Sequence, residues 1–496
     1  MLFEEKKVLE QKLNAILHEL NQLKKLIFGS KSERFVPASS PPEQLELFST
    51  QQSGSSSAKE EEKEIITYQR NKKKKHPGRT PLPDNIPTED VIIEPEEDTT
   101  DMQLIGEEIT ETIDYTPGKL IKRRYIRKKY VRSTKQQEQG SSAVVIAPAP
   151  PRPLPKALAE AGLLAHLFIS KYIDHLPFYR QIQIFKRQYG WTLHKSTING
   201  WFAACCTLLK PLYDAHIRAV MQSDYLQADE SHIKVQDSNK SARLNGGKGK
   251  THQGYMWVYR NPLNGLVLFD YRKGRDMQSP KECLANFKGT LQCDGYNVYK
   301  SIANKQPDIH LVSCLAHIRR KFYDALNHHP DLAKYALKEI KKLYSIERQC
   351  REENLSVQHI AQRRKDKSAP IFNALLEWVE TQHSTNLSKG PIGQALYYAK
   401  NELPLLSAYL EDGRIEIDNN LIENTIRPLA LGRKNYLFAG SHQAAQRAAM
   451  MYSFFASCKT MDINPFYWLK DVLQTIGDTP VNQVAKLLPH NWGKKM

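Results

Sequence analysis

The feature that most constrains the fold is a regular succession of strand-like and helix-like segments between residues 224 and 326. Three strand-like runs come first, separated by the loops GGKGK and NPLNG, as in a meander. After them helical and strand patterns alternate. The expected strands are YLQADESHIKV (225–235), GYMWVYR (254–260), LVLFDYR (266–272), TLQCD (290–294) and IHLVSC (309–314). This succession predicts a layered α/β domain, because strands and helices must bury their apolar faces against each other.

The order of the segments is βββ-α-β-α-β-α, with helices expected at 279–287, 296–303 and 316–326. It is the order of a ribonuclease-H-like sheet, and the alternation in its second half favours a mixed sheet with helices on both faces. We therefore expect a five-stranded α/β core to begin in residues 222–330. A polar helical insertion (331–412), the final helix of the core (413–455) and a helical C-terminal extension (456–496) follow.

The sequence before residue 222 divides into four parts. Residues 1–30 carry a heptad pattern. Residues 31–79 are rich in Pro, Ser, Gln and Glu and end in a lysine run, which is typical of a flexible basic linker. Residues 80–146 predict a small basic β-rich region that a Pro-rich hinge closes, and 152–218 are helical.

The first part is expected to form a coiled coil. Its apolar residues alternate spacings of four and three, which are the a and d positions of a heptad. They are Leu9, Leu13, Ile16, Leu20, Leu23 and Ile27. The alternative is an amphipathic helix that packs on its own protein. We favour self-association, and hence a homo-oligomer, because an isolated helix of this length is marginally stable in water.

Basic side chains dominate the charge of the chain and gather before the hinge. Lys and Arg number 71 against 54 Asp and Glu, a formal net charge of +17. This excess favours polyanionic partners, although it also serves solubility. In 119–135 basic residues alternate with Leu, Ile, Tyr and Val, which predicts a half-buried strand with a basic outer face. The candidates for DNA contact there are Lys122, Arg123, Arg124, Arg127, Lys128 and Lys129.

A helix-turn-helix pattern occurs within residues 152–218. The segments LPFYRQIQIFKRQY and STINGWFAACCTLL are joined by a short turn at Gly190, and Ser196 is a suitable N-cap for the second helix. The residues that lead this second helix would contact DNA, namely Lys195, Ser196, Thr197 and Asn199. Because any helical bundle contains such turns, ordinary packing helices are the alternative.

Three acidic residues stand where a metal-dependent site could form, namely Asp229, Asp294 and Glu423. Asp229 lies within the first strand, Asp294 at the end of the fourth, and Glu423 in the first turn of the last core helix. In a ribonuclease-H-like sheet the first and fourth strands are neighbours, and the last helix crosses above them. The three carboxylates would then hold two divalent ions, since Mg²⁺ prefers oxygen ligands.

Each of the three residues also has a purely structural explanation. Asp229 could be an exposed strand carboxylate, and Asp294 precedes Gly295 in a common turn dipeptide. Glu423 could be the N3 partner of a capping box. The other acidic candidates are Asp237, Asp270 and Asp418. The basic residues after Glu423 would hold phosphates or form a solvated face, and they are Arg427, Arg433 and Lys434.

Several stretches resemble the transposases of the insertion sequence 66 family, which belong to a larger group with a DDE triad. They are FGSKSER, LPFYRQ, STINGW, LQADES, LQCDGY, SCLAHIRRKF and IDNNLIENTIRPLALGRKNYLFAGS, and they cover nearly the whole chain. The resemblance implies a DNA transposase that binds the inverted repeats at the ends of its element and cuts and joins DNA with Mg²⁺ or Mn²⁺. Asp229, Asp294 and Glu423 match the triad. The implied partners are double-stranded DNA at the element ends and the target, and small companion proteins of the same element.

One departure from that family concerns zinc. Its usual zinc-binding module has paired Cys-x-x-Cys motifs, whereas this chain has no cysteine before Cys205. Zinc binding is therefore not expected, and residues 88–133 keep only the basic character of the module. Cys314 and His317 form one Cys-x-x-His pair without a second pair, which favours packing beside the fifth strand.

Two other functions remain open from the sequence, a ribonuclease-H-like nuclease or resolvase and a catalytically inert DNA-binding repressor. No apolar run reaches the ~20 residues of a membrane-spanning helix. The seven scattered cysteines fit reduced thiols better than a disulfide framework. We expect a bacterial protein that is cytoplasmic and associated with the nucleoid. We do not expect it to contact a membrane.

Overall fold

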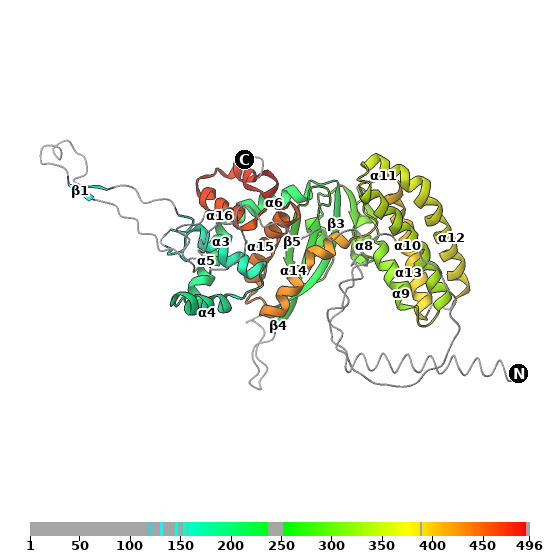
Figure 1. Cartoon of the computed structure of the whole chain (residues 1–496), viewed down its shortest axis with the longest axis horizontal. Coiled ribbons are helices and arrows are strands. Elements are labelled where there is room, and N and C mark those ends of the chain that lie inside the picture. The colour runs from blue at the N-terminus through cyan, green and yellow to red at the C-terminus, as the bar shows by residue number, and fades with distance from the viewer. Residues whose placement is uncertain are drawn as a thin grey trace, which may run out of the picture. The chain divides into compact units, whose positions relative to one another are not determined.

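Five strands form one mixed sheet in the order β5-β4-β3-β6-β7 (Figure 1). They are β3 Tyr225–Gln236, β4 Thr251–Arg260, β5 Val267–Arg272, β6 Gly289–Gln292 and β7 Ile309–Val312. β4 is antiparallel to β3 and β5, whereas β6 runs parallel to β3 and β7 runs parallel to β6. The expected five-stranded mixed sheet is confirmed, with its first strand at the centre. This computed structural model describes residues 118, 120, 129–131, 144–146, 152–155, 157–236, 251–386 and 389–492.

One face of the sheet is covered by α14 (Asn420–Tyr436) and α15 (His442–Thr460). Ile233 of β3 is buried in the core that these helices share with the sheet. α15 also covers the edge strand β5. There the Ser453 hydroxyl accepts the N–H of Phe269 at 2.8 Å, and the Ser457 hydroxyl accepts the N–H of Val267 at 2.9 Å. These hydroxyls satisfy edge amides that could otherwise pair with another chain.

The opposite face packs against α6 (Lys210–Met221), α7 (Gln278–Cys283) and α8 (Asn297–Ala303). Ala228 of β3 lies in this second core with Trp257 of β4 and Tyr299 of α8. Side chains alternate across a strand, so Asp229 projects to the other face, the one that buries Ile233. Helices therefore cover both faces, as expected for a sheet with parallel strands.

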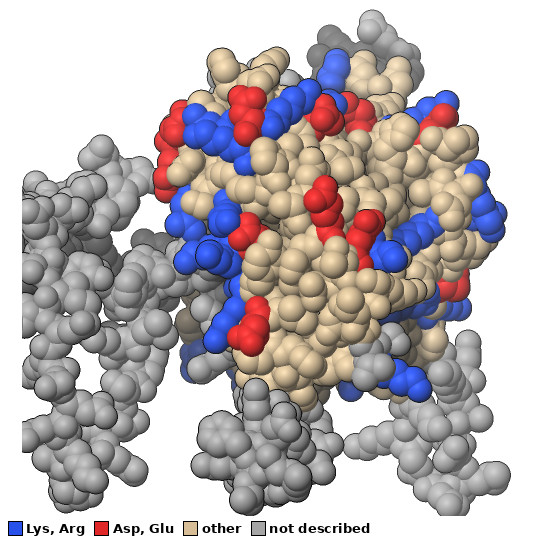
Figure 2. Space-filling model, turned by 90° about the vertical axis from the view of Figure 1, so that its right-hand side faces the viewer, with Lys and Arg blue, Asp and Glu red and all other residues tan. Residues whose placement is uncertain are grey.

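A helical region follows β7 and precedes α14. It consists of α9 (Leu315–Asp324), α10 (Pro330–Glu352), α11 (Val357–Arg363), a π-helical turn (Arg364–Ser368), α12 (Ala369–Thr385) and α13 (Pro391–Leu406). These helices enclose a third core, to which Val312 of β7 and Tyr225 of β3 contribute. On the face of this region in Figure 2, acidic and basic side chains are interspersed among broad uncharged areas. That face therefore combines both signs of charge.

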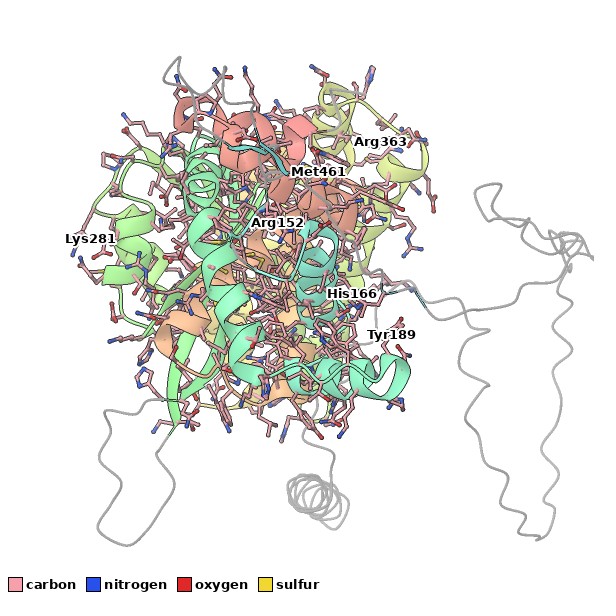
Figure 3. The ribbon with its side chains drawn as sticks, turned by 90° about the vertical axis from the view of Figure 1, so that its left-hand side faces the viewer. Arg152, His166, Tyr189, Lys281, Arg363 and Met461 are labelled. Carbon is pink, nitrogen blue, oxygen red and sulfur yellow. The ribbon has the colours of Figure 1, made fainter. Side chains whose placement is uncertain are left out.

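The helix-turn-helix pattern corresponds to α4 (Phe178–Tyr189) and α5 (Lys195–Leu208), which pack with α3 (Ala161–Tyr172). Gly190 ends α4 with a φ of 64°, a left-handed conformation that favours glycine. The prediction of Ser196 as N-cap is wrong. The N-cap is His194, which makes no side-chain capping bond, because α5 begins at Lys195 and Ser196 already lies in its first turn. Figure 3 shows this region from the side that exposes His166 and Tyr189.

The C-terminal helices complete the core around α3. α16 (Pro465–Thr475) packs on α3, and Trp468 is buried in the same core as Phe168. A 3₁₀ turn (Val481–Leu487) and α17 (Pro489–Trp492) follow. The predicted boundary between residues 455 and 456 falls inside α15, which continues to Thr460. The expected separate extension 456–496 shares its core with 152–218, because α3 buries its apolar side against α16.

Little of the region before residue 152 is described. Two short strands, β1 (Lys129–Val131) and β2 (Val144–Ile146), pair antiparallel. The coiled coil, the linker and Lys122, Arg123, Arg124, Arg127 and Lys128 lie outside the described residues, as does the side chain of Lys129. Within the described part of the chain, no helix combines the length and apolarity needed to span a bilayer.

Candidate active site

Asp229 and Asp294 occupy matching positions on neighbouring parallel strands. Gln227 of β3 lies opposite Gln292 of β6, and each aspartate follows its glutamine by two residues. β3 continues past Asp229, whereas β6 ends at Gln292, so Asp294 lies where the chain leaves the sheet. The N–H of Tyr296 donates to Oδ1 of Asp294 at 3.1 Å and fixes its carboxylate. The sheet therefore delivers two of the three predicted carboxylates to one place.

The glycine after Asp294 permits a close contact with the helical region. A Cβ on Gly295 would lie 2.7 Å from the ring of Tyr398 on α13. The N–H of Gly295 also donates to the Tyr398 hydroxyl at 3.1 Å. The Asp-Gly dipeptide thus serves this contact as well as the turn, and it brings α13 to the border of the site.

Two buried glutamines hold the segment that leads to α14. The Gln227 amide donates to Oε1 of Gln292 at 2.9 Å and to the carbonyl of Asp418 at 3.1 Å. The Gln292 amide donates to the carbonyls of Ser313 at 3.2 Å and Glu416 at 2.8 Å. Buried polar groups are costly when unpaired, so these bonds fix the path of residues 416–418 past Gln227 of β3 and Gln292 at the end of β6.

The same segment sets where α14 begins. The N–H of Asn419 donates to the Cys314 sulfur at 3.3 Å, which joins the start of α14 to the start of α9. Asp418 accepts the N–H of Asn420 at 3.0 Å. Asp418 is therefore a residue that shapes this helix start, and Glu423 lies in the first turn beyond it. This anchoring brings Glu423 near Asp229 of β3.

Four carboxylates form what we call the acidic cluster, namely Asp229, Glu230, Asp294 and Glu423. Burial raises the pKa of Asp229 well above its usual value, and repulsion by the carboxylates of Glu230, Asp294 and Glu423 raises it further. The N–H of Glu230, which donates to Oδ1 of Asp229 at 2.7 Å, acts in the opposite direction. The structure thus brings the three predicted residues into one electrostatic field, together with a fourth that was not predicted. Glu230 points to the opposite face of β3 from Asp229, the face of Trp257, and acts on Asp229 from the other side of the strand.

The acidic cluster fits a hard divalent cation by its chemistry. All its donors are carboxylate oxygens, which Mg²⁺ and Mn²⁺ accept as ligands. A cation would remove the repulsion that raises the pKa of Asp229. Within residues 152–492, as far as the structure describes them, no three His, Cys, Asp or Glu side chains already stand at the spacing of a metal site.

Sequence reasoning missed Glu230 and Arg275 and assigned His317 to packing. Nε2 of His317, in the first turn of α9, lies 3.8 Å from Oε1 of Glu423. The motif SCLAHIRRKF pointed to the neighbourhood of His317 without revealing its partner. Arg275 pairs with Glu230, 45 positions earlier in the chain, and no local sequence pattern predicts such a pair.

The basic residues after Glu423 have different surroundings. Arg433 is half-buried, and its Nη1 donates to the Ser231 hydroxyl at 3.1 Å and to the His232 carbonyl. Burial lowers the pKa of Arg433. This side chain ties α14 to β3, whereas Arg427 and Lys434 are exposed. The phosphate-binding role predicted for all three stays a prediction.

The remaining candidate residues from the sequence differ in how exposed they are and in whether they form an ion pair. On α5, Lys195, Ser196 and Asn199 are exposed and Thr197 is half-buried. Asp270 pairs with Arg272 at 2.8 Å and lies on β5, away from the acidic cluster. Asp237 falls outside the described residues.

Three family models match this chain. "Transposase IS66 family" matches residues 156–447, "Transposase C of IS166 homeodomain" matches 16–91, and "IS66 C-terminal element" matches 453–490. The first covers the sheet, the helical region and the whole acidic cluster. The second covers part of the expected coiled coil and the linker.

Curated relatives and a solved structure were also found. The uncharacterized protein y4jD of Sinorhizobium fredii (strain NBRC 101917 / NGR234) is 33% identical over 433 residues, which cover 83% of this chain and 81% of the relative. The uncharacterized protein y4hP of the same strain is 30% identical over 446 residues, covering 84% and 77%.

The solved structure is a Drosophila P element transposase strand transfer complex, with 11% identity and a TM-score of 0.32. The match covers 60% of this chain and 92% of that one, and it is too distant to carry an argument. The family models and the curated relatives, taken together, establish that the chain belongs to the IS66 family of transposases.

Proposed function

We propose that this protein cuts DNA at the ends of a mobile element and joins those ends to target DNA in a reaction that requires Mg²⁺ or Mn²⁺. The observation that carries the proposal is the convergence of Asp229, Asp294 and Glu423 beside the carboxyl end of β6, where β3 continues past it. Membership of a transposase family supplies the substrate class. A divalent ion held there would activate the attacking oxygen and stabilise the leaving one.

The residues of the chain would share the work as follows. Asp229 and Asp294 offer oxygen ligands from the rigid sheet, and Glu423 offers its carboxylate from α14. Nε2 of His317 lies 3.8 Å from Oε1 of Glu423, so this imidazole would adjoin a metal-bound Glu423 carboxylate. The buried Gln227 and Gln292 bonds fix the elements that carry these ligands.

DNA binding would use other parts of the chain. The exposed start of α5 would contact bases or phosphates of the terminal repeats, and the basic stretch 119–135 would contact the phosphate backbone. The coiled coil would join two or more protomers so that both element ends meet. Small proteins of the same element are proposed as further partners, and zinc is not part of this proposal because the expected cysteine ligands are missing.

The test uses the full chain and duplexes that carry the inverted repeats flanking its gene. Asp229→Ala, Asp294→Ala and Glu423→Ala should each reduce cleavage and strand transfer by at least 10³-fold, because each removes a ligand for the metal ions. DNA affinity should change less than about threefold, since Lys and Arg contacts to phosphates dominate it. Glu377→Ala, an exposed acid on α12, is the matched control and should behave as wild type.

Three outcomes would contradict this proposal. Metal-dependent cleavage without joining would make the chain a nuclease or resolvase. DNA binding without any cleavage would make it a repressor with an inert catalytic fold. Strand transfer that persists in Asp294→Ala would remove that residue from the triad.

A further inference from the structure

Glu230 follows Asp229 on β3. Within the acidic cluster, Glu230 is the carboxylate that forms an ion pair with an arginine, Arg275. Its side chain is 5% exposed, and Oε1 accepts hydrogen bonds from Nε of Arg275 at 2.8 Å and from Nη2 of the same guanidinium. This pairing neutralises one of four mutually repelling carboxylates. Arg275 therefore places a positive charge directly at the border of the cluster.

Arg275 is held in position by more than the ion pair. Its guanidinium lies over the ring of Tyr296, 4.1 Å from the ring centre, and the Tyr296 hydroxyl donates to the Arg275 carbonyl at 3.0 Å. The N–H of Tyr296 in turn binds the Asp294 carboxylate. A guanidinium that is stacked and hydrogen-bonded in this way has lost most of its freedom before any ligand arrives.

The guanidinium is nevertheless accessible. The Arg275 side chain is 45% exposed, and both of its hydrogen bonds to described residues go to Glu230 through Nε and Nη2. Nη1 is therefore left for a ligand from solvent. Pairing with Glu230 raises the pKa of Arg275 against the opposing effect of burial, so the side chain stays charged.

We propose that Arg275 binds a non-bridging oxygen of a DNA phosphate beside the scissile one and so positions the strand over the acidic cluster. This inference rests on the proposed function. In it, the positive charge of Arg275 offsets the repulsion between the DNA backbone and the four carboxylates. Metal ions would neutralise charge at the scissile phosphate, but a neighbouring phosphate would need a cation of the chain itself, and Arg275 is a fixed cation beside Glu230 and Tyr296. A fixed guanidinium offers planar, charge-assisted hydrogen bonds to such an oxygen.

The alternative is an ion pair that only stabilises the loop after β5. The two explanations differ in one measurable property. A phosphate contact couples Arg275 to one particular phosphate of the DNA, whereas a structural pair acts equally on all substrates.

The experiment measures single-turnover cleavage of an element-end duplex by the full-length protein with Mg²⁺. A single neutral methylphosphonate replaces each phosphate near the cleavage site in turn. Arg275→Ala should slow cleavage of native DNA about 100-fold, and Arg275→Lys should recover about tenfold of that loss, as expected for a charge-assisted contact made during reaction. Lys273→Ala, an exposed lysine of the same loop, is the control and should cleave at the wild-type rate.

The decisive result is whether the effect of Arg275→Ala depends on the charge of one particular phosphate. At one position, the methylphosphonate should slow wild type about as much as Arg275→Ala does, and the combination should be no slower than either change alone. Purely additive effects at every position would overturn the inference, as would wild-type rates in Arg275→Ala. Melting temperatures identify misfolding, and if Arg275→Ala does not fold, the same coupling is measured with Arg275→Lys. Wild-type protein that cleaves no DNA would overturn both this inference and the proposed function, whereas normal cleavage without coupling would overturn only the inference.

Discussion

Asp229 carries its carboxyl group among three other carboxylates, those of Glu230, Asp294 and Glu423. Burial and this repulsion both favour the neutral acid, so ionising Asp229 costs the folded chain more than it costs the unfolded chain. The raised pKa means that stability falls as the pH rises from the ordinary aspartate value of about 4 towards the folded-state pKa. The folded chain therefore pays for the ionised form of Asp229, and the metal ion proposed above would offset that cost.

Asp229→Asn removes this cost, because the amide cannot ionise. In the presence of a chelator, the variant should melt at a higher temperature than wild type at pH 7, and the difference should shrink as the pH approaches 4. Melting curves at pH 5, 6, 7 and 8 provide the measurement, with Glu377→Gln as the exposed control. Added Mg²⁺ should stabilise wild type more than the variant. A melting temperature that does not change with the substitution at any pH would contradict the account.

At the same scale, the sequence predicts some neighbours and not others. Asp229 and Asp294 could be placed together because strand order and parity fix their positions. Arg275 and Tyr296 could not, since their contact with Glu230 depends on how two loops pack after the sheet has formed. Long-range pairs of this kind leave no periodic trace in the sequence.

The π-helical turn between α11 and α12 carries a buried ion pair. Nε and Nη2 of Arg364 donate to the two oxygens of Glu347 on α10, at 2.9 and 2.8 Å. Nη1 of Arg364 donates to the carbonyls of Tyr409, Asp412 and Ile415, each at 2.9 Å. The guanidinium thereby joins the helical region to the segment that leads into α14.

Glu347→Ala would leave the Arg364 charge buried and uncompensated. We expect a loss of about 3–5 kcal/mol in the free energy of unfolding, the range for breaking a buried pair from one side. Glu347→Gln keeps one acceptor and should lose less. Denaturant unfolding followed by a helical signal gives the measurement, and the exposed pair Lys365–Glu411 supplies the control in Glu411→Ala. If Glu347→Ala lowers the free energy of unfolding by less than about 1 kcal/mol, water must solvate the Arg364 guanidinium in place of Glu347.

Element boundaries follow from the sequence where a single residue decides them. Gly190 ends α4 as the pattern indicates. The start of α5 does not follow Ser196, because His194 takes the N-cap position and the helix begins two residues earlier than the local preference suggests. The start of α14 depends on Gln227 and Gln292, which lie on distant strands, so the helix pattern alone could not locate it.

At the scale of the whole molecule, the heptad pattern in residues 1–30 predicts assembly into an oligomer. Leu13→Asp with Leu20→Asp would bury two charges between helices at a cost of several kcal/mol. The double variant should sediment as a smaller species than wild type, whereas Glu19→Gln, between the heptad positions, should not change the oligomer. An unchanged oligomer in the double variant would make this segment a helix that packs on its own protein.

The division of the chain into modules is where the sequence was least informative. Apolar periodicity indicates that a helix has a face to bury. It does not indicate which other helix or sheet will cover that face. Residues 152–218 and 456–496 each look like independent helical parts, and yet α3 and α16 share one core with a face of the sheet. Their association is set by complementary surfaces far apart in the sequence.

The sharing of that core has a consequence for protein synthesis. The ribosome releases α3–α5 and the first two carboxylates early, whereas Glu423 and then α16 emerge much later. A nascent or truncated chain that stops before α14 lacks Glu423, and one that stops before α16 lacks the surface on which α3 packs. The acidic cluster and the core around α3 are therefore completed only when the helices from α14 to α16, near the end of the chain, have been translated.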